Sequence, residues 1–378
     1  MKRFLRHTST AFAVPLAAAG GLILSALCGA GCRRPEPEPR RLQWETMGTV
    51  AAVQVTAPAD DSRAREIAQA AFGALESELS AWREDSALAA VNRGAGGPAA
   101  TPISSVFADV LRFSLDICGE SGGAFNPLIG PVMSLWGFNG ATPRAAPPGR
   151  DELAAAAALT DWRGVELRTS GGGISVRLPK AGMRLDLGAV AKGYAVDVAW
   201  ERLTAAGCTN LLIDLGGNLR AIGEAARGRG GWRTGVRDPF EPDALIGQFL
   251  MRPGEAVATS GNYERFVEIG GTRYAHIMDS RTGTPVTGMA GTTVLAPTAA
   301  LADALSTTIF VLGPEKGAAL LLRHPGCEAL WIPDAPASPT LYATAGMAAR
   351  FTPFAGARAY RLVVVRPPQN TNTQERRP

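Results

Sequence analysis

The 378-residue chain is poor in the side chains that most often bind zinc or form disulfides. It has three histidines and five cysteines, and two of those cysteines, Cys28 and Cys32, lie in an apolar leader. The other three, Cys118, Cys208 and Cys327, are odd in number and widely spaced. This spacing argues against a disulfide framework and offers no zinc cluster. We expect these three cysteines to be buried as small apolar residues.

The chain also lacks an excess of charge once the leader is set aside. It has 38 Lys and Arg against 34 Asp and Glu, but residues 1–32 hold three of the basic residues and none of the acidic ones. The rest carries 35 basic and 34 acidic side chains, a net charge of +1. So small a charge gives no support for nucleic acid as a partner.

The long apolar run of the leader is typical of a secretory signal. Residues 1–32 begin with basic side chains, continue as an interrupted apolar stretch and end in small residues. We expect Cys32 to carry a lipid, since Gly31 precedes it and a polar segment follows. Cys28 is the alternative, and an ordinary cleaved signal without a lipid is another. Either signal predicts export, and a lipid predicts anchoring on the periplasmic face of a bacterial membrane.

Two polar segments bound the part of the chain that is expected to fold. Residues 33–41 alternate Pro with Glu and Arg, which predicts a stiff, solvated tether. Residues 367–378 are predicted to be a disordered tail. Residues 42–366 remain, enough for one large domain or for two closely joined lobes.

The apolar pattern of residues 42–366 predicts an α+β fold. Helical spacing is found near 62–80, 103–119, 151–159, 189–207 and from 301 onward. Strand-like patterns are found at 49–57, 164–169, 173–179, 183–188, 231–238, 246–252, 255–260 and 292–296, with hairpins at 210–223 and 264–279. Hairpins mixed with long helices predict mainly antiparallel sheets with packed helices. No Gly-x-Gly-x-x-Gly sequence follows the first strand, so a dinucleotide-binding fold has little support.

The stretch "RLDLGAVAKGYAVD" puts charged groups where an apolar core would not need them. Asp186 is predicted at the end of a strand, and a helix that opens at Gly188 would carry Lys192 in its first turns. The N–H groups at a helix N-terminus favour phosphate. The alternative is a simple turn at Asp186 with Lys192 in solvent.

The stretch "YAHIMDSRTGTPV" contains the one histidine in a motif-like setting. His276 ends a predicted hairpin, and Asp279, Arg281 and Thr282 follow it closely. A histidine, a carboxylate, a guanidinium and hydroxyls within seven residues suit proton transfer and anion binding. A structural histidine is the alternative.

The stretch "LADALSTTIF" places polar groups on one face of a predicted helix. Asp303, Ser306 and Thr307 are three and four residues apart and share that face. Carboxylate, hydroxyl and carbonyl oxygens are ligands that Mg²⁺ prefers. The alternative is that Asp303 caps the helix and the hydroxyls bond back to it.

Taken together, seven ordered motifs resemble the ApbE family, the FAD:protein FMN transferases. The motifs are "MGT" (47–49), "GGAFNPLIGPVMSLWGF" (122–138), "DLGAVAKGYAVD" (186–197), "LIDLGGN" (212–218), "ATSGNYERF" (258–266), "HIMDSRTGTPV" (276–286) and "ADALSTT" (302–308). The resemblance implies an ApbE-like, T-fold-like architecture and an enzyme with FAD as substrate and Mg²⁺ as cofactor. It implies transfer of FMN to a Thr or Ser hydroxyl of an acceptor protein, with release of AMP. Acceptors in the family are typically subunits of membrane redox complexes.

The resemblance also assigns residues to the site. It implies that the flavin nucleotide is contacted by Met47, Trp82, Ala124, Phe125, Asn126, Asp186, Lys192 and Ile277. It implies that the metal is held by the side chains of Asp303 and Thr307, with backbone oxygens near Ala189 and Ser306. For the proton acceptor we choose His276, with Asp279 second.

Two positions depart from the family pattern, and two other functions stay open. Many members have Asp where Asn126 stands, so a carboxylate role is excluded at that position. Some members have an acidic residue where Lys192 stands, and a lysine there would attract phosphate or a flavin carbonyl. An FAD pyrophosphatase would use the same site with water as the nucleophile. A flavin-binding lipoprotein without turnover is the alternative of another class.

Overall fold

The computed structural model describes residues 39–56, 61–139, 144–226, 228–241 and 243–366. The predicted signal peptide with Cys28 and Cys32, most of the tether and the predicted tail lie outside the described residues. Within the described residues, no helix combines the length and apolar character needed to cross a membrane.

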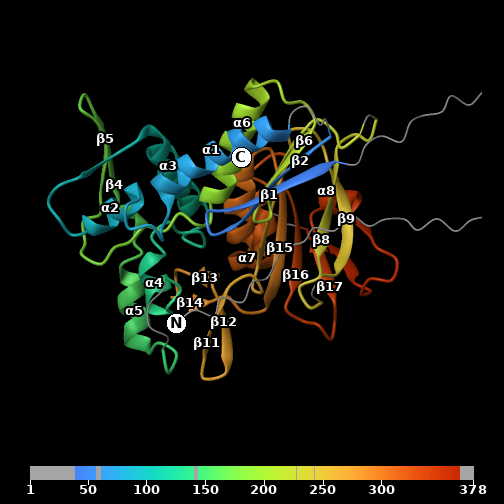
Figure 1. Cartoon of the computed structure of the whole chain (residues 1–378). Coiled ribbons are helices and arrows are strands. Elements are labelled where there is room, and N and C mark those ends of the chain that lie inside the picture. The colour runs from blue at the N-terminus through green and yellow to red at the C-terminus, as the bar shows by residue number, and fades with distance from the viewer. Residues whose placement is uncertain (1–38, 57–60, 140–143, 227, 242, 367–378) are drawn as a thin grey trace, which may run out of the picture.

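A nine-stranded sheet forms the centre of the described part of the chain (Figure 1). The strand order is β1-β2-β6-β7-β10-β15-β16-β17-β19, and every neighbouring pair is antiparallel except β17 with β19. The strands are β1 (Arg40–Thr46), β2 (Thr49–Val55), β6 (Leu211–Leu215), β7 (Asn218–Ile222), β10 (Ala256–Gly261), β15 (Met289–Ala296), β16 (Glu328–Pro333), β17 (Thr340–Ala343) and β19 (Arg361–Val364). Their mainly antiparallel pairing, with packed helices, confirms the predicted α+β class.

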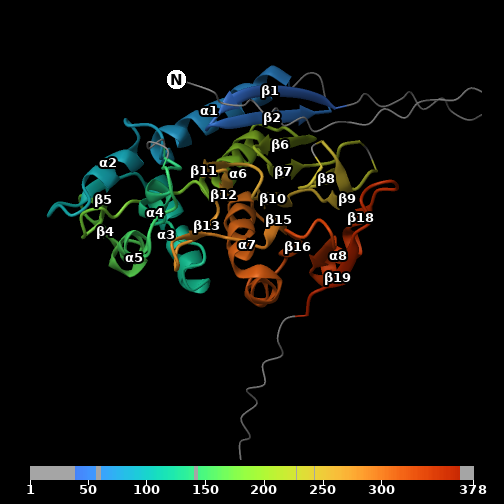
Figure 2. The same ribbon diagram turned by 90° about the horizontal axis from the view of Figure 1, so that it is seen from below.

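Both faces of this sheet are covered, and the alternation of side chains along its strands shows how. In β6, Leu211 and Ile213 pack into one apolar cluster while Leu212 packs into another. One face carries three helices, α1 (Asp61–Leu79), α6 (Ala191–Ala205) and α7 (Ala299–Leu321) (Figure 2). The other face carries β8 (Trp232–Arg237), β9 (Leu245–Met251), β18 (Thr352–Pro353) and α8 (Ala345–Arg350).

Residues between α1 and α6 form a helix-rich part beside the sheet (Figure 1). It contains α2 (Ala87–Arg93), α3 (Ser105–Glu120), α4 (Gly130–Leu135), α5 (Arg150–Ala158) and a small sheet of β3 (Thr101–Ile103), β4 (Glu166–Ser170) and β5 (Gly173–Arg177). Phe107 and Leu128 of this part share one apolar cluster with Leu305 and Phe310 of α7. The helix-rich part and the sheet are therefore joined by a continuous core.

Two small hairpins lie between β10 and β15 in the chain. The first pairs β11 (Phe266–Ile269) with β12 (Thr272–Ala275), and the second pairs β13 (Met278–Asp279) with β14 (Thr284–Pro285). Gly270 and Gly271 turn the first hairpin with φ of 60° and 79°, a conformation that glycine adopts without strain. The predicted hairpins at 210–223 and 264–279 are both confirmed.

Several sequence predictions are wrong at the level of elements. Residues 183–188 form no strand, because the side chain of Asn92 takes the place of a partner strand: it donates to the Leu185 oxygen at 3.0 Å and accepts from the Leu185 N–H at 2.7 Å. Helix α6 begins at Ala191, later than the Gly188 that we expected. Strand β1 already begins at Arg40, inside the predicted tether. The prediction that Cys118, Cys208 and Cys327 are buried is confirmed.

Candidate active site

The start of α7 fixes where its polar face lies. Thr298 caps the helix by accepting from the Leu301 N–H at 3.3 Å. The carboxylate of Asp197, from α6, accepts from the N–H groups of Ala299 and Ala300, both at 2.8 Å, and pairs with Arg220 at 2.7 Å. The N-terminal N–H groups of α7 are thus satisfied without Asp303. Asp303 lies one turn inside the helix, so the capping alternative is excluded.

Asp303 is buried, with 5% of its surface exposed, and is held from α6. The N–H of Gly193 donates to Asp303 Oδ2 at 3.0 Å, and Lys192 Nζ lies 3.4 Å from the same oxygen. A Cβ at Gly193 would stand 2.2 Å from the Ala299 oxygen and 2.7 Å from Asp303 Cβ. Glycine at this position therefore allows the two helices to approach closely enough for the N–H to reach the carboxylate.

A chain of hydroxyl groups links β10 to the polar face of α7. Ser306 donates to the backbone oxygen of Asp303 at 2.9 Å, and Ser260 lies 2.8 Å from Ser306 Oγ and 3.2 Å from Thr307 Oγ1. A hydroxyl has one proton to donate. Ser306 gives its proton to the backbone oxygen of Asp303, so in the contact between Ser260 and Ser306 the donor is Ser260. Since Ser260 has then used its proton, Thr307 is the donor to Ser260. The lone pairs of Thr307 stay available for a ligand.

The sequence prediction overlooked Ser260, although it lies in the quoted "ATSGNYERF" motif. It also assigned a backbone oxygen near Ser306 to the metal. In the structure this oxygen accepts from the Thr292 hydroxyl at 2.8 Å. A role for it as a ligand stays a prediction, and its visible role is to tie α7 to β15.

Asp186 and Lys192 lie on either side of the turn that leads into α6. The Gly188 N–H donates to Asp186 Oδ1 at 2.9 Å, and the Lys192 ammonium donates to the Gly188 oxygen at 3.1 Å. We expected the N–H groups of this helix to be open to phosphate. The Gly193 N–H is instead used by Asp303, so this donor faces a carboxylate of the protein itself.

The ring of His276 is held in one tautomer by the base of the β11–β12 hairpin. Its backbone N–H and its Nδ1 both lie 3.1 Å from the Arg265 oxygen. A carbonyl only accepts, so Nδ1 carries the proton and the lone pair is on Nε2. Burial, together with the positive charges of Arg265 and Lys192, lowers the pKa of His276 to about 4. The ring is neutral at pH 7.

Asp279, the second choice for proton acceptor, is engaged by its neighbour. Arg281 donates to both of its carboxylate oxygens, from Nε at 2.8 Å and from a terminal nitrogen at 2.7 Å. The Arg281 N–H adds a third bond at 3.0 Å. Because these donors occupy the carboxylate of Asp279, we favour His276 over Asp279 as the proton acceptor.

The apolar residues assigned to the flavin come from distant parts of the chain. Phe125 and Ile277 are buried in the same cluster as Leu305 of α7, and Met47 and Ala189 pack against it. Ala124 is also buried. Met47 has a φ of 47°, which is uncommon for a residue with a side chain, in the tight turn between β1 and β2.

Asn126 and Trp82 differ in how they could meet a ligand. The Asn126 amide donates to the Thr160 oxygen at 2.9 Å and to Ser280 at 3.1 Å, and accepts from the Leu128 N–H at 2.9 Å. Asn126 therefore holds three segments together. Trp82 is 57% exposed, and the Arg265 guanidinium stacks on its ring at 4.9 Å. Arg265, which the sequence prediction missed, connects Trp82 to His276.

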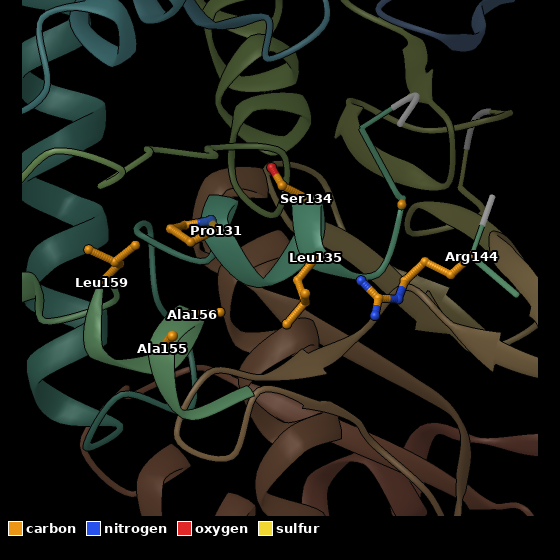
Figure 3. Close-up of a pocket in the computed structure, with 8 residues that line it drawn as sticks. Pro131, Ser134, Leu135, Arg144, Ala155, Ala156 and Leu159 are labelled. Carbon is orange, nitrogen blue, oxygen red and sulfur yellow. The ribbon is translucent and has the colours of Figure 1, made fainter. Parts of the chain in front are cut away.

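A separate hollow of about 430 Å³ lies between α4 and α5 (Figure 3). Its lining is mostly apolar, with Leu135, Ala156 and Leu159 among the residues, and Arg144 at one end. None of the eight lining residues belongs to the predicted site. We place the candidate site at α6, α7 and the base of the β11–β12 hairpin, because Gly193 of α6 donates to Asp303 of α7 and the charge of Lys192 contributes to the lowered pKa of His276.

Known proteins resemble this chain over most of its length. The model of the ApbE family matches residues 47–331. The FAD:protein FMN transferase of Treponema pallidum (strain Nichols) is 39% identical over 333 residues, which cover 83% of this chain and 91% of the relative. That of Vibrio cholerae (serotype O1) is 32% identical over 307 residues, which cover 79% and 88%.

Solved structures agree with the fold. The crystal structure of the ApbE protein from Thermotoga maritima has a TM-score of 0.73 at 28% identity and covers 83% of this chain and 99% of its own. The flavin transferase ApbE from Vibrio cholerae gives a TM-score of 0.72 at 27% identity, with the same coverage.

Proposed function

The chain belongs to the ApbE family, and from this premise we propose how its site moves FMN from FAD to an acceptor protein. It is an FAD:protein FMN transferase, like curated relatives that are 29–39% identical over most of the chain. The observation that carries the proposed mechanism is the buried carboxylate of Asp303. It lies 3.4 Å from the ammonium of Lys192 and shares its helix face with the Thr307 hydroxyl.

We place Mg²⁺ at Asp303, Thr307 and the backbone oxygen of Ala189. Within the described residues, no group of three or more His, Cys, Asp or Glu side chains is arranged to hold a metal. The proposed set differs in kind, because it uses one carboxylate with neutral oxygens, and Mg²⁺ completes such a shell with water and phosphate oxygens. When bound, Mg²⁺ supplies positive charge that offsets the negative charge of the FAD diphosphate.

The residues around this position supply orientation and proton transfer. The acceptor hydroxyl gives its proton to Nε2 of His276, and its oxygen attacks the phosphorus of the FMN half. The phosphoester to the acceptor forms as the bond to AMP breaks, and AMP leaves. The charge of Lys192 is attractive to the diphosphate, and Met47, Phe125 and Ile277 offer apolar surface to the flavin.

Two other functions are distinguished by the nucleophile and by turnover. A pyrophosphatase would use the same groups with water and would release FMN and AMP. A flavin-binding lipoprotein would bind FAD without releasing AMP. The buried Asp303 with its linked hydroxyls favours turnover over simple binding, since flavin binding alone requires no buried carboxylate.

The test is a mass measurement. A soluble fragment beginning at Arg33 is incubated with FAD, Mg²⁺ and a domain of a candidate redox subunit, and the acceptor is analysed by intact mass. We expect a gain equal to an FMN phosphoester and equimolar AMP, both lost on chelation and in Asp303→Ala. Glu315→Ala, which removes an exposed carboxylate from the same helix, should behave as wild type.

The possible outcomes separate the functions. AMP with free FMN and an unmodified acceptor would identify a pyrophosphatase. Bound FAD without any AMP would leave a flavin-binding protein. Full transfer of FMN after chelation would refute the proposal that the reaction requires a divalent metal.

We also propose where the enzyme works. The leader supports export and a lipid at Cys32, which would keep the domain next to the membrane and its redox complexes. Intact mass of the membrane-bound protein tests this, since Cys32→Ser should lose the lipid mass and appear in the soluble fraction. Retention of the lipid in Cys32→Ser would point to Cys28.

A further inference from the structure

The side chain of Lys192 is surrounded by the kind of oxygen atoms that bind a metal. Its ammonium donates to the Gly188 carbonyl oxygen at 3.1 Å and lies 3.4 and 3.5 Å from the two carboxylate oxygens of Asp303. Gly188 adjoins Ala189, whose carbonyl we assign to the metal. A cation of the protein thus contacts the Asp303 carboxylate, which is proposed to hold Mg²⁺, and the carbonyl of Gly188, the residue next to the proposed ligand Ala189.

This contact between Lys192 and Asp303 is largely enclosed by protein. The side chain of Asp303 is 6% exposed and that of Lys192 is 28% exposed. Removing a carboxylate from water is costly unless a positive charge or hydrogen bonds compensate. Besides Lys192, the hydrogen bond of Asp303 Oδ2 is to the neutral N–H of Gly193. Lys192 therefore supplies the compensating charge while no divalent cation is bound.

Two cations next to one carboxylate repel each other. When a divalent cation binds Asp303, the ammonium of Lys192 no longer has a net attraction to that position. The Lys192 side chain is long and has rotatable bonds, so its ammonium can move while its backbone stays in α6. The pKa of His276 is lowered first by burial and then by the charges of Arg265 and Lys192, so Lys192 already lies within electrostatic reach of the proton acceptor.

We infer that Lys192 acts as an internal substitute for the divalent metal at Asp303 and is released toward the FAD diphosphate when the metal binds. This inference rests on the metal site of the proposed function. Lys192 then weakens metal binding in the enzyme without FAD and strengthens FAD binding in the enzyme with metal. The Lys192 side chain thus couples the two ligands: bound metal strengthens the binding of FAD, and bound FAD strengthens the binding of metal.

The test measures metal binding without turnover. Mn²⁺ is titrated into the purified full-length protein at pH 7.5 without FAD, and free Mn²⁺ is followed by electron paramagnetic resonance. We expect the dissociation constant to fall about tenfold in Lys192→Met relative to wild type, a coupling of ordinary size. Lys192→Arg keeps the charge and should bind Mn²⁺ as wild type does. Lys180→Met, which removes an exposed lysine elsewhere, should also match wild type.

A second arm measures FAD. Quenching of flavin fluorescence after rapid mixing should show that Lys192→Met binds FAD about tenfold more weakly than wild type at saturating Mn²⁺. In EDTA, where Asp303 holds the lysine, the two should differ little. Thermal unfolding of each variant establishes that it is folded.

The results separate this inference from the proposed function. Unchanged or weaker Mn²⁺ binding in folded Lys192→Met, with normal binding in wild type, would overturn the role of Lys192 alone. No Mn²⁺ binding by wild type would overturn both the metal site and this inference. An equal loss of FAD affinity with Mn²⁺ and in EDTA would refute the release of Lys192.

Discussion

The close approach of α6 and α7 at Gly193 yields the sharpest structural prediction. A methyl group at this position would stand 2.2 Å from the Ala299 oxygen, whereas real Cβ atoms essentially never come within 3.0 Å of such an atom. The carbonyl is backbone and cannot rotate away. Gly193→Ala must therefore push the helices apart by at least about 0.8 Å. This displacement would move the backbone N–H of residue 193, which donates to the Asp303 carboxylate.

The magnitude follows from two opposing effects. Alanine is better than glycine in a helix by about 1 kcal/mol, and overpacking costs about 1–3 kcal/mol or more. A clash with backbone belongs at the upper end, so we expect a net loss of about 2 kcal/mol in the free energy of unfolding. Displacing catalytic groups by about 1 Å can reduce turnover by about a hundredfold, and we expect a loss of that order in AMP release.

The matched control is Gly73→Ala in α1. This glycine also lies inside a helix, but a Cβ there meets nothing within 4 Å. The same substitution should raise the free energy of unfolding by about 1 kcal/mol and leave AMP release unchanged. Denaturant unfolding and AMP release are measured for both variants. A Gly193→Ala protein with wild-type stability and activity, beside a normally behaving Gly73→Ala, would refute the close packing of α6 on α7.

Three further predictions concern the charged groups of the site and its support. Asp303→Ala should lower the rate of AMP release about a thousandfold and His276→Ala about a hundredfold, because stabilisation of charge contributes more than the general base in phosphoryl transfer. Steady-state rates in which His276→Ala is the more damaging substitution would contradict this order. The pKa of His276, lowered to about 4 by burial, lies below the ordinary 6.5, so the unfolded chain takes up the proton first as the pH falls. The free energy of unfolding should therefore fall by about 2 kcal/mol between pH 7 and pH 4.5, and His276→Gln should not show this decrease. Denaturant unfolding with the same pH dependence in both proteins would count against a buried neutral ring. Asp197→Asn should lower the free energy of unfolding by about 3 kcal/mol, because it leaves Arg220 buried without a counter-charge, whereas Asp109→Asn on an exposed ion pair should change it by less than about 1 kcal/mol.

Much of the fold could be predicted from the sequence where the determining interactions are local. The hairpin at 264–279 was predictable because Gly270 and Gly271 accept a positive φ and alternating residues flank them. The face shared by Asp303 and Thr307 follows from helical geometry alone. Local patterns failed at 183–188, where apolar and polar residues alternate as in a strand but the partner is the side chain of Asn92, about ninety positions earlier in the chain.

The order of the motifs along the chain is enough to indicate the family, the substrate and the types of side chain in the site. Which of those side chains meet depends on how the helices and strands pack together. Ser260 reaches Thr307 because β10 packs against α7, and Lys192 reaches Asp303 because Gly193 has no side chain to keep the helices apart. Asn126, which its motif assigns to the ligand, donates to Thr160 and Ser280, two contacts that the sequence did not indicate. Contacts between residues far apart in the chain depend on how whole elements pack, and packing is a property of the assembled core that no local pattern contains.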